Sequence, residues 1–308
     1  MIISASRRTD IPAFYSDWFL NRIKEQFVLV RNPFNSKLLS RIDLNPNKID
    51  CIVFWTKNPK NIISRLEELK DYKYYFQFTL NPYDSSIELR VAKKVQIIKT
   101  FIELSQKIGK SKVIWRYDPI FLTRKMDIKY HIKYFNHLAE ILSPYTEKCI
   151  ISFLDLYKKC EKNIKTLEAR VPNNHDIIEL SHGFKNATGL YDLKIETCSE
   201  DIDLMDFGFE HGHCVDQDLI ERIIGYKIKA SKDKYQRNAC GCIESTDIGE
   251  YNTCSHNCLY CYANYSLTAV KNNILKHDPL SPLITGQITK DCIIKDKNDY
   301  FQSNLRFK

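Results

Sequence analysis

Short runs of β-branched and aromatic residues recur along the first two hundred positions of the chain, and most of them are apolar on both faces. Runs of this kind are typical of strands that are covered on both sides. They predict strands at 2–6, 27–31, 51–55, 74–78, 113–117, 149–153 and 193–197.

Amphipathic helices are predicted between most of these strands, with apolar stripes over 62–69, 91–104 and 128–142. The alternation of strand and helix predicts βα units and a parallel sheet. Seven predicted strands favour a closed ring over a small open sheet. The predicted fold is therefore α/β, a TIM-like (β/α) barrel that is partial or nearly closed.

Polar residues stand where several of these predicted strands end. Active sites of βα barrels lie at the carboxyl ends of the strands, so these residues are candidates for chemistry. Arg116 lies at the end of the fifth predicted strand, Asp118 follows it, and Glu196 lies in the last one. They are the candidate catalytic residues of the barrel, and simple contact of strand ends with solvent is the alternative explanation.

Composition narrows the class of protein. The chain has 308 residues, 44% of them hydrophobic, which is enough for a large core, but no run reaches the roughly 20 apolar residues of a membrane span. The first residues, MIISASRRTDIP, do not read as a secretory signal. The 11 cysteines are therefore predicted to be reduced thiols of a cytoplasmic protein. A net charge of +8 is compatible with a polyanionic partner without requiring one.

Three cysteines form a compact pattern near the end of the chain. Cys254, Cys258 and Cys261 are spaced C-x3-C-x2-C among polar neighbours, which disfavours inert core thiols. A structural zinc site would need a fourth ligand such as His256 or a distant cysteine. A four-cysteine iron–sulfur cluster for electron transfer would need another thiolate. Three thiolates alone would fix three corners of a four-iron cluster and leave the fourth iron open to a reactant.

This pattern resembles the signature of the radical S-adenosylmethionine (SAM) superfamily, in the version found in spore photoproduct lyase-like proteins. The resemblance implies that Cys254, Cys258 and Cys261 hold an oxygen-sensitive [4Fe-4S] cluster whose open iron binds the amino and carboxylate groups of SAM. Cleavage of SAM by one electron would then release a 5′-deoxyadenosyl radical that starts chemistry on a substrate. The resemblance also places Tyr260 beside the adenine and implies a reductant protein of the flavodoxin or ferredoxin type.

The whole chain also resembles an uncharacterised bacterial family that is named only as a domain of unknown function. The stretches that carry this resemblance are SRRTDIPAFY at 6–15, VFWTKNP at 53–59, IWRYDP at 114–119 and the segment from CGC at 240 to CYANY at 265.

The position of the cysteine pattern departs from that of most radical SAM proteins, in which it follows the first barrel strand. Either the cysteine loop and a helix over 262–273 form the opening βα unit, placed last in the chain, or the loop caps a barrel made by the preceding residues. The usual glycine-rich motif that contacts SAM is missing, so no SAM contact beyond Tyr260 is assigned. The predicted organisation is a barrel core at 1–197, a cysteine-rich cluster-binding segment at 198–265 and a tail at 266–308 that packs on the barrel.

Four further cysteines precede this pattern, namely Cys198, Cys214, Cys240 and Cys242. Four thiolates match a second [4Fe-4S] cluster or an all-thiolate zinc site, and unrelated thiols are the remaining alternative. Because the chain is already expected to bind one cluster, a second, auxiliary cluster is the prediction.

The substrate is less well marked. The segment KIKASKDKYQR at 227–237 has five basic residues, and Tyr235 within it could stack on a base. Arg7 and Arg8 follow the first strand and could bind a phosphate or carboxylate. A nucleic acid is the leading substrate hypothesis, with a peptide or small metabolite as alternatives. The functional alternatives are a zinc-stabilised binding module and an iron–sulfur electron-transfer protein.

Overall fold

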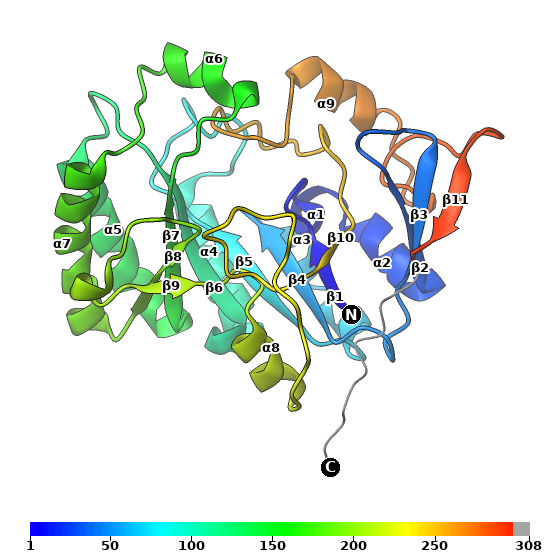
Figure 1. Cartoon of the computed structure of the whole chain (residues 1–308), viewed down its shortest axis with the longest axis horizontal. Helices are drawn as coiled ribbons and strands as arrows, with labels where there is room; N and C mark the ends of the chain where they lie inside the picture. Colours follow the sequence, from blue (N-terminus) through cyan, green and yellow to red (C-terminus); the bar gives the residue numbers. More distant parts are fainter. Residues whose placement is uncertain (298–308) are drawn as a thin grey trace.

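The computed structural model describes residues 1–297 (Figure 1). The strands are β1 (Ile2–Ala5), β2 (Phe27–Arg31), β3 (Leu38–Asp43), β4 (Cys51–Thr56), β5 (Tyr74–Thr79), β6 (Val113–Ile120), β7 (Lys148–Phe153), β8 (Lys194–Cys198), β9 (Glu210–Gly212), β10 (Thr246–Asp247) and β11 (Ile293–Asp296). The α-helices are α1 (Ile11–Phe14), α2 (Ser16–Glu25), α3 (Lys60–Ile63), α4 (Lys94–Ile108), α5 (Ile128–Leu142), α6 (Lys158–Thr166), α7 (Asn174–Tyr191), α8 (Gln217–Ile224) and α9 (Leu267–Ile274). Short 3-10 helices cover Leu66–Leu69, Lys110–Lys112, Ser143–Tyr145 and Met205–Phe207.

The main sheet has eight strands in the order β10-β1-β4-β5-β6-β7-β8-β9, and each neighbouring pair is parallel. β9 and β10 stand at opposite ends of this order and are not paired with each other, so the sheet is open. The prediction of a TIM-like barrel, partial or nearly closed, is therefore wrong. The α/β class and the parallel sheet are as expected.

The sheet stays open because of how its strands are distributed. The predicted strand at 27–31 is β2, which pairs antiparallel with β3 in a separate three-stranded sheet of order β11-β3-β2. The two strands that end the main sheet, β9 and β10, have only three and two residues, which is too short to close a ring. The face that would line a barrel is covered instead by the cysteine-rich segment around α8.

Helices α4, α5 and α7 cover the other face of the main sheet (Figure 1). Phe135 of α5 stacks on Trp115 of β6 at 5.1 Å between ring centroids and on Phe184 of α7 at 4.0 Å. α5 begins where the Asp127 side chain accepts a hydrogen bond from the Tyr130 backbone N–H at 2.8 Å. The stripes at 91–104 and 128–142 thus correspond to α4 and α5, whereas the stripe at 62–69 is split between α3 and a 3-10 helix.

We call the face of the sheet beneath the α8 segment the inner face. Near the amino ends of the strands it is apolar and packs on that segment through Ile2, Val53, Tyr75, Ile114 and Ile150. Two positions farther along β5, β6 and β7, the side chains are Gln77, Arg116 and Ser152, all of them buried. Since side chains alternate along a strand, the inner face changes from apolar to polar toward the carboxyl ends of the strands.

The segment after the cysteine loop packs on the small sheet and on α2. β11 pairs in parallel with β3, and the Trp18 indole N–H donates to the Ser281 carbonyl at 3.0 Å. Residues 298–308 of the predicted tail lie outside the described residues. None of the helices in the described part of the chain has the length and apolar character needed to cross a membrane.

Candidate functional site

The three-cysteine loop directly follows β10 and precedes α9 (Figure 1). β10 pairs in parallel with β1, with Thr246 opposite Ile3 and Asp247 opposite Ser4. The Asp247 carboxylate accepts hydrogen bonds from Ser4 Oγ at 3.0 Å and from Ser6 Oγ at 2.6 Å, which fixes this junction. In the order of the sheet, the unit formed by β10, the loop and α9 therefore stands before β1, although it comes late in the chain.

The loop is attached to segments that follow the carboxyl ends of β1 and β5. The Leu259 N–H donates to the Ile87 carbonyl, and the Arg90 N–H donates to the His256 carbonyl, both at 3.0 Å. His256 Nε2 lies 2.8 Å from Asp10 Oδ2 in a buried contact. This contact occupies Nε2, whereas Nδ1 of His256 is buried and has no partner among the described residues, so His256 still has one ring nitrogen that could complete a zinc site with the three cysteines.

The three thiols lie close together, since charges on Cys261 and Cys258 raise the pKa of Cys254 and a charge on Cys261 raises that of Cys258. Burial is the largest influence, and it raises the pKa of Cys258 to about 12. Two features act in the opposite direction: the Ala263 N–H donates to Cys261 Sγ at 3.3 Å, and the charge of Lys57 lowers the pKa of Cys258. These features favour the thiolate, which is the form that binds metals.

Glu88 is central to the attachment of the loop, and the sequence analysis missed it. Lys57 Nζ lies 2.8 Å from Glu88 Oε1, and Lys94 and the Tyr260 hydroxyl also donate to this carboxylate. Burial would raise the pKa of Glu88, but the two ammonium groups outweigh it and lower the pKa to about 2. A backbone bridge between Glu88 and Cys258 brings this ionised network against the thiols.

Tyr260 is held by the protein core. The residue is 8% exposed, and its ring contacts Tyr83 and Phe121, with ring centroids 5.8 and 6.0 Å away. Its hydroxyl also accepts a hydrogen bond from Asn81 Nδ2 at 3.2 Å. The ring is therefore already packed on both aromatic neighbours, and a ligand at the loop would meet the backbone of Tyr260.

The four upstream cysteines come together at the inner face. Cys198 Sγ lies 3.0 Å from Cys214 Sγ, and Cys242 hydrogen-bonds with both Cys214 and Cys240. The Val215 N–H donates to Cys242 Sγ at 3.3 Å. These residues, which we call the four-cysteine cluster, form a row of neighbouring thiols in the order Cys198, Cys214, Cys242, Cys240.

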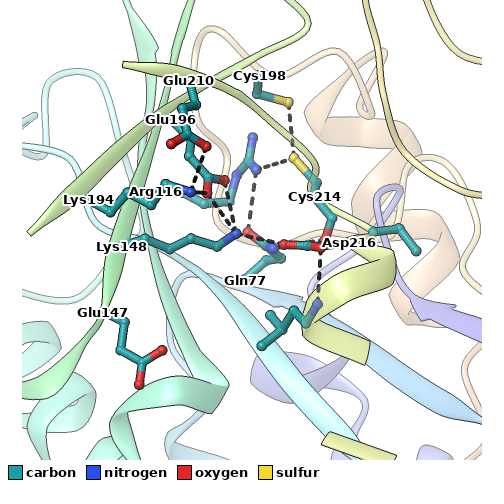
Figure 2. Close-up of polar contacts among 12 residues, drawn as sticks. Gln77, Arg116, Glu147, Lys148, Lys194, Glu196, Cys198, Glu210, Cys214 and Asp216 are labelled. Carbon is teal, nitrogen blue, oxygen red and sulfur yellow. Dashed lines mark hydrogen bonds and ion pairs between the residues drawn. The ribbon is translucent and has the colours of Figure 1, made fainter. Parts of the chain in front are cut away.

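Two arginines supply positive charge to the four-cysteine cluster. Arg116 Nη1 donates to Cys214 Sγ at 2.6 Å (Figure 2). The hydrogen bond with Cys214, followed by the charge of Arg116, lowers the pKa of Cys198 to about 7. Hydrogen bonds from neighbouring thiols, followed by the charge of Arg7, lower the pKa of Cys242. Cys198 and Cys242 are thus the thiols suited to metal binding, whereas hydrogen bonds with these same two neighbours raise the pKa of Cys214 and of Cys240. Within residues 1–297 no three His, Cys, Asp or Glu side chains are already arranged to hold a metal ion.

Arg116 and Asp118, two of the candidate catalytic residues, pair with each other. Arg116 Nε lies 3.1 Å from Asp118 Oδ2, and the Ser152 hydroxyl donates to the other carboxylate oxygen. Burial would raise the pKa of Asp118, but the charge of Arg116 is the main reason that it is lowered. Since both Arg116 and Lys57 act on Asp118, this ionised carboxylate lies between the four-cysteine cluster and the three-cysteine loop.

Glu196, the third candidate, belongs to a buried ion-pair network. Lys148 Nζ lies 2.9 Å from Glu196 Oε2 and 2.8 Å from Asp216 Oδ2, and Figure 2 shows Lys148 pointing between the two. Lys194 Nζ lies 3.2 Å from Glu196 Oε1 and 2.8 Å from Glu210 Oε2. These contacts give Glu196 a structural role, and its catalytic role stays a prediction.

The Lys148→Met variant is expected to lower the free energy of unfolding by about 3 kcal/mol, because two buried carboxylates lose their shared ammonium group. Breaking a buried ion pair costs about 3–5 kcal/mol. We expect the lower value because Glu196 retains its ion pair with Lys194, and Asp216 retains its hydrogen bond from the Leu219 N–H. Denaturant unfolding measures the change. The matched control is Lys194→Met, which removes a half-exposed lysine and should cost less than about 1 kcal/mol. An equal loss of unfolding free energy in the two variants would contradict the structural role of the buried Lys148 ion pairs.

The basic segment 227–237 runs beside the four-cysteine cluster. The Asp233 N–H donates to the Cys242 carbonyl at 2.9 Å, and Arg237 Nη1 lies 2.5 Å from Asp155 Oδ2. Tyr235 is 95% exposed. Part of the charge of the segment is thus balanced by acidic partners, while the ring of Tyr235 is open to solvent.

The family of the chain follows from its comparison with known families. The family described as "Domain of unknown function (DUF1848)" matches residues 2–263. The chain belongs to this family. The resemblance to a family named only as a domain of unknown function is thereby confirmed. The part of the chain that matches DUF1848 contains the main sheet, the four-cysteine cluster and the three-cysteine loop. No curated protein and no solved structure matches the chain.

Proposed function

We propose that this DUF1848 chain is a radical SAM enzyme in which Cys254, Cys258 and Cys261 hold a [4Fe-4S] cluster. The observation that carries the proposal is the position of the three thiols. They directly follow β10, the strand that stands before β1 in the sheet, and they contact segments beyond the carboxyl ends of the strands. Open α/β sheets bind ligands at this edge. The late position of the thiols in the chain is thus reconciled with an early position in the sheet.

The donor set fits such a cluster. Backbone N–H groups hydrogen-bond the thiols of Cys254 and Cys261, whereas the proton of the Tyr260 hydroxyl goes to Glu88. Hydrogen bonds to the sulfurs tune clusters of this kind. When bound, the cluster and SAM supply one-electron chemistry.

The chain's own residues would orient the loop and keep water from it. The Glu88–Lys57 ion pair and the Asp10–His256 contact hold the loop to the sheet, and Tyr260 and Phe121 form an apolar support beneath it. The backbone of Tyr260 would contact the adenine of SAM, because the Tyr260 ring is packed in the core.

The four-cysteine cluster is our proposed site for a second [4Fe-4S] cluster. A specific observation favours zinc as the second candidate for this site. The Sγ atoms of Cys198 and Cys214 are 3.0 Å apart, and sulfurs around one tetrahedral zinc ion lie about 3.8 Å apart for bonds of about 2.3 Å. Four thiolates around a four-iron cluster lie farther apart, because the cluster stands between them. The binding of a [4Fe-4S] cluster therefore requires a larger movement of these four thiols than the binding of a zinc ion.

Metal analysis of the anaerobically prepared chain separates these candidates. Two clusters predict about eight iron and eight sulfide ions per chain, whereas one cluster and one zinc ion predict about four iron ions and one zinc ion. The Cys214→Ala variant is expected to lose only the second metal. A loss of all metal from this variant would contradict the assignment of two separate sites.

The function itself is tested by adding SAM and dithionite to anaerobically prepared, iron-loaded protein. Formation of 5′-deoxyadenosine supports a radical SAM enzyme. Two outcomes would overturn the proposal: a colourless protein that binds only zinc, as a binding module would, or an iron–sulfur protein that transfers electrons without cleaving SAM.

A nucleic acid is the proposed substrate class, supported by the basic segment 227–237 and the exposed ring of Tyr235 beside the site. A flavodoxin- or ferredoxin-type protein is the proposed reductant. Binding of single-stranded oligonucleotides that weakens steeply with added salt would support this substrate, and salt-independent or undetectable binding would contradict it.

A further inference from the structure

Two guanidinium groups lie over one indole ring at the inner face. Arg7 Cζ is 4.9 Å from the centroid of the Trp55 ring, and Arg116 Cζ is 5.3 Å from it. Cations placed over an indole face are held by the ring quadrupole. Arg7 follows β1, Trp55 lies on β4 and Arg116 lies on β6, so the main sheet fixes the relative positions of all three.

This group joins the two cysteine sites. The Tyr262 hydroxyl, directly after the three-cysteine loop, donates to the Arg7 carbonyl at 2.7 Å. On the other side, Arg116 donates to the Cys214 sulfur of the four-cysteine cluster. A molecule that contacts Arg7 and Trp55 would therefore lie beside both sets of thiols.

Two hydrogen-bond donors of this group lack acceptors. Arg7 Nη2 and Trp55 Nε1 are buried and have no partner among the described residues. The other two tryptophans are satisfied, since the indole of Trp18 donates to the Ser281 carbonyl and that of Trp115 donates to the Leu80 carbonyl. Buried donors without partners are rare in proteins and call for an explanation.

The charges in this group are also unequally balanced. Arg116 is fully engaged, because it donates to Asp118, Gln77 and Cys214. Arg7 has an ion pair with Asp233 at 3.7 Å, which is longer than a hydrogen bond. Its side chain is 17% exposed while Nη2 itself is buried, so an anion would reach the two donors only after a small movement of the Arg7 side chain. A positive charge with a spare N–H beside a spare indole N–H is a pair of donors suited to one oxyanion.

We propose that Arg7 Nη2 and Trp55 Nε1 bind an oxyanion of the substrate, a carboxylate or a phosphate. The inference names the substrate class of the proposed radical SAM site and in that respect rests on the proposed function. The site selects molecules that carry an oxyanion and places that group between the two sets of cysteines. Arg116 supports the Trp55 ring and adds positive charge, whereas its own N–H groups stay with protein partners.

Calorimetric titration of the anaerobically prepared protein with inorganic phosphate and with acetate, at constant ionic strength, tests the inference. We expect saturable binding of one anion per chain. The Trp55→Phe variant keeps an aromatic ring beneath the guanidinium groups but loses the N–H, and its affinity should fall about ten-fold. The Arg7→Gln variant should lose at least as much. The relative affinities for phosphate and acetate identify which of the two oxyanions the site prefers.

Arg65→Gln is the matched control, since Arg65 pairs with Asp17 and Glu68 on the outer surface and its variant should bind the anion as the wild type does. An absence of anion binding by the wild type, or equal binding by wild type and Trp55→Phe, would overturn the inference. Because Trp55→Phe is a mild change, this comparison stands even where Arg7→Gln fails to fold. Anion binding without SAM cleavage would overturn the proposed function and leave the anion site intact. SAM cleavage without anion binding would overturn the anion site and leave the proposed function intact.

Discussion

The Cys258→Ala variant is expected to form no detectable 5′-deoxyadenosine from SAM and dithionite. Cys258 lies at the middle of the three-cysteine loop, where a backbone bridge to Glu88 and the charge of Lys57 hold it in place. With two thiolates left, the loop cannot hold three corners of a four-iron cluster, so about four iron ions per chain should be lost as well. Chromatographic detection of 5′-deoxyadenosine and iron analysis of the same preparation measure both effects.

The control for this variant is Cys292→Ala. Cys292 packs against the small cluster formed by Leu29, Leu39 and Leu283, and its sulfur contacts Thr289. Removal of this thiol should leave the iron content and the rate of SAM cleavage unchanged. Full activity in Cys258→Ala, or an equal loss in both variants, would contradict the assignment of the three-cysteine loop.

The Glu88→Gln variant is expected to lower the free energy of unfolding by about 3–5 kcal/mol, because Lys57 and Lys94 lose their ion pairs with a carboxylate that is only 2% exposed. SAM cleavage should fall by at least about ten-fold, since the loop around Cys258 loses its main anchor and small displacements are costly in catalysis. Denaturant unfolding and 5′-deoxyadenosine formation are the two measurements.

Glu68→Gln is the matched control for Glu88→Gln. Glu68 also lies between two cations, Arg65 and Lys24, but its side chain is 30% exposed. Solvent screens such surface pairs, so its loss should cost less than about 1 kcal/mol and leave activity unchanged. A similar loss of stability in the two variants would show that burial of the Glu88 network is unimportant.

The effect of Glu88 also depends on pH in a defined direction. Its pKa is about 2 in the folded chain against an ordinary value of 4.5, so the ionised form stabilises the fold. This contribution is complete above pH 4.5 and is lost as the pH falls toward 2. The difference in unfolding free energy between wild type and Glu88→Gln should therefore stay constant from about pH 7 to 5 and narrow below that. A difference in unfolding free energy that grows below pH 5 would contradict the ion pairs of Glu88 with Lys57 and Lys94.

Much of the sheet could be predicted from sequence, because buried parallel strands carry apolar residues on both faces. The runs at 51–55, 74–78, 113–117, 149–153 and 193–197 all became strands of the main sheet. The run at 27–31 has the same character but pairs with β3 through contacts that its own residues do not reveal. The prediction of a partial or nearly closed barrel was wrong for a related reason, since the strands that end the open sheet are too short to be recognised in the sequence.

The cysteines of the site were recognisable from spacing and residue type, whereas their surroundings were not. Cys198, Cys214, Cys240 and Cys242 were predicted to converge, and they lie together at the inner face. Glu88 stands alone in an ordinary loop sequence, and it gains its importance from Lys57 and Tyr260, which are distant in the chain. Such partners become visible only when the sheet brings their segments together.

The pairing of β10 with β1 joins Ser4 and Asp247, which are 243 positions apart. During synthesis on the ribosome, the strands that receive the cysteine loop emerge first, and the loop emerges after them. Domains generally fold as units, so the main sheet is completed, and the loop docks, only after β10 has emerged. In the proposed enzyme, metal would therefore reach the three thiols only after most of the chain has been made.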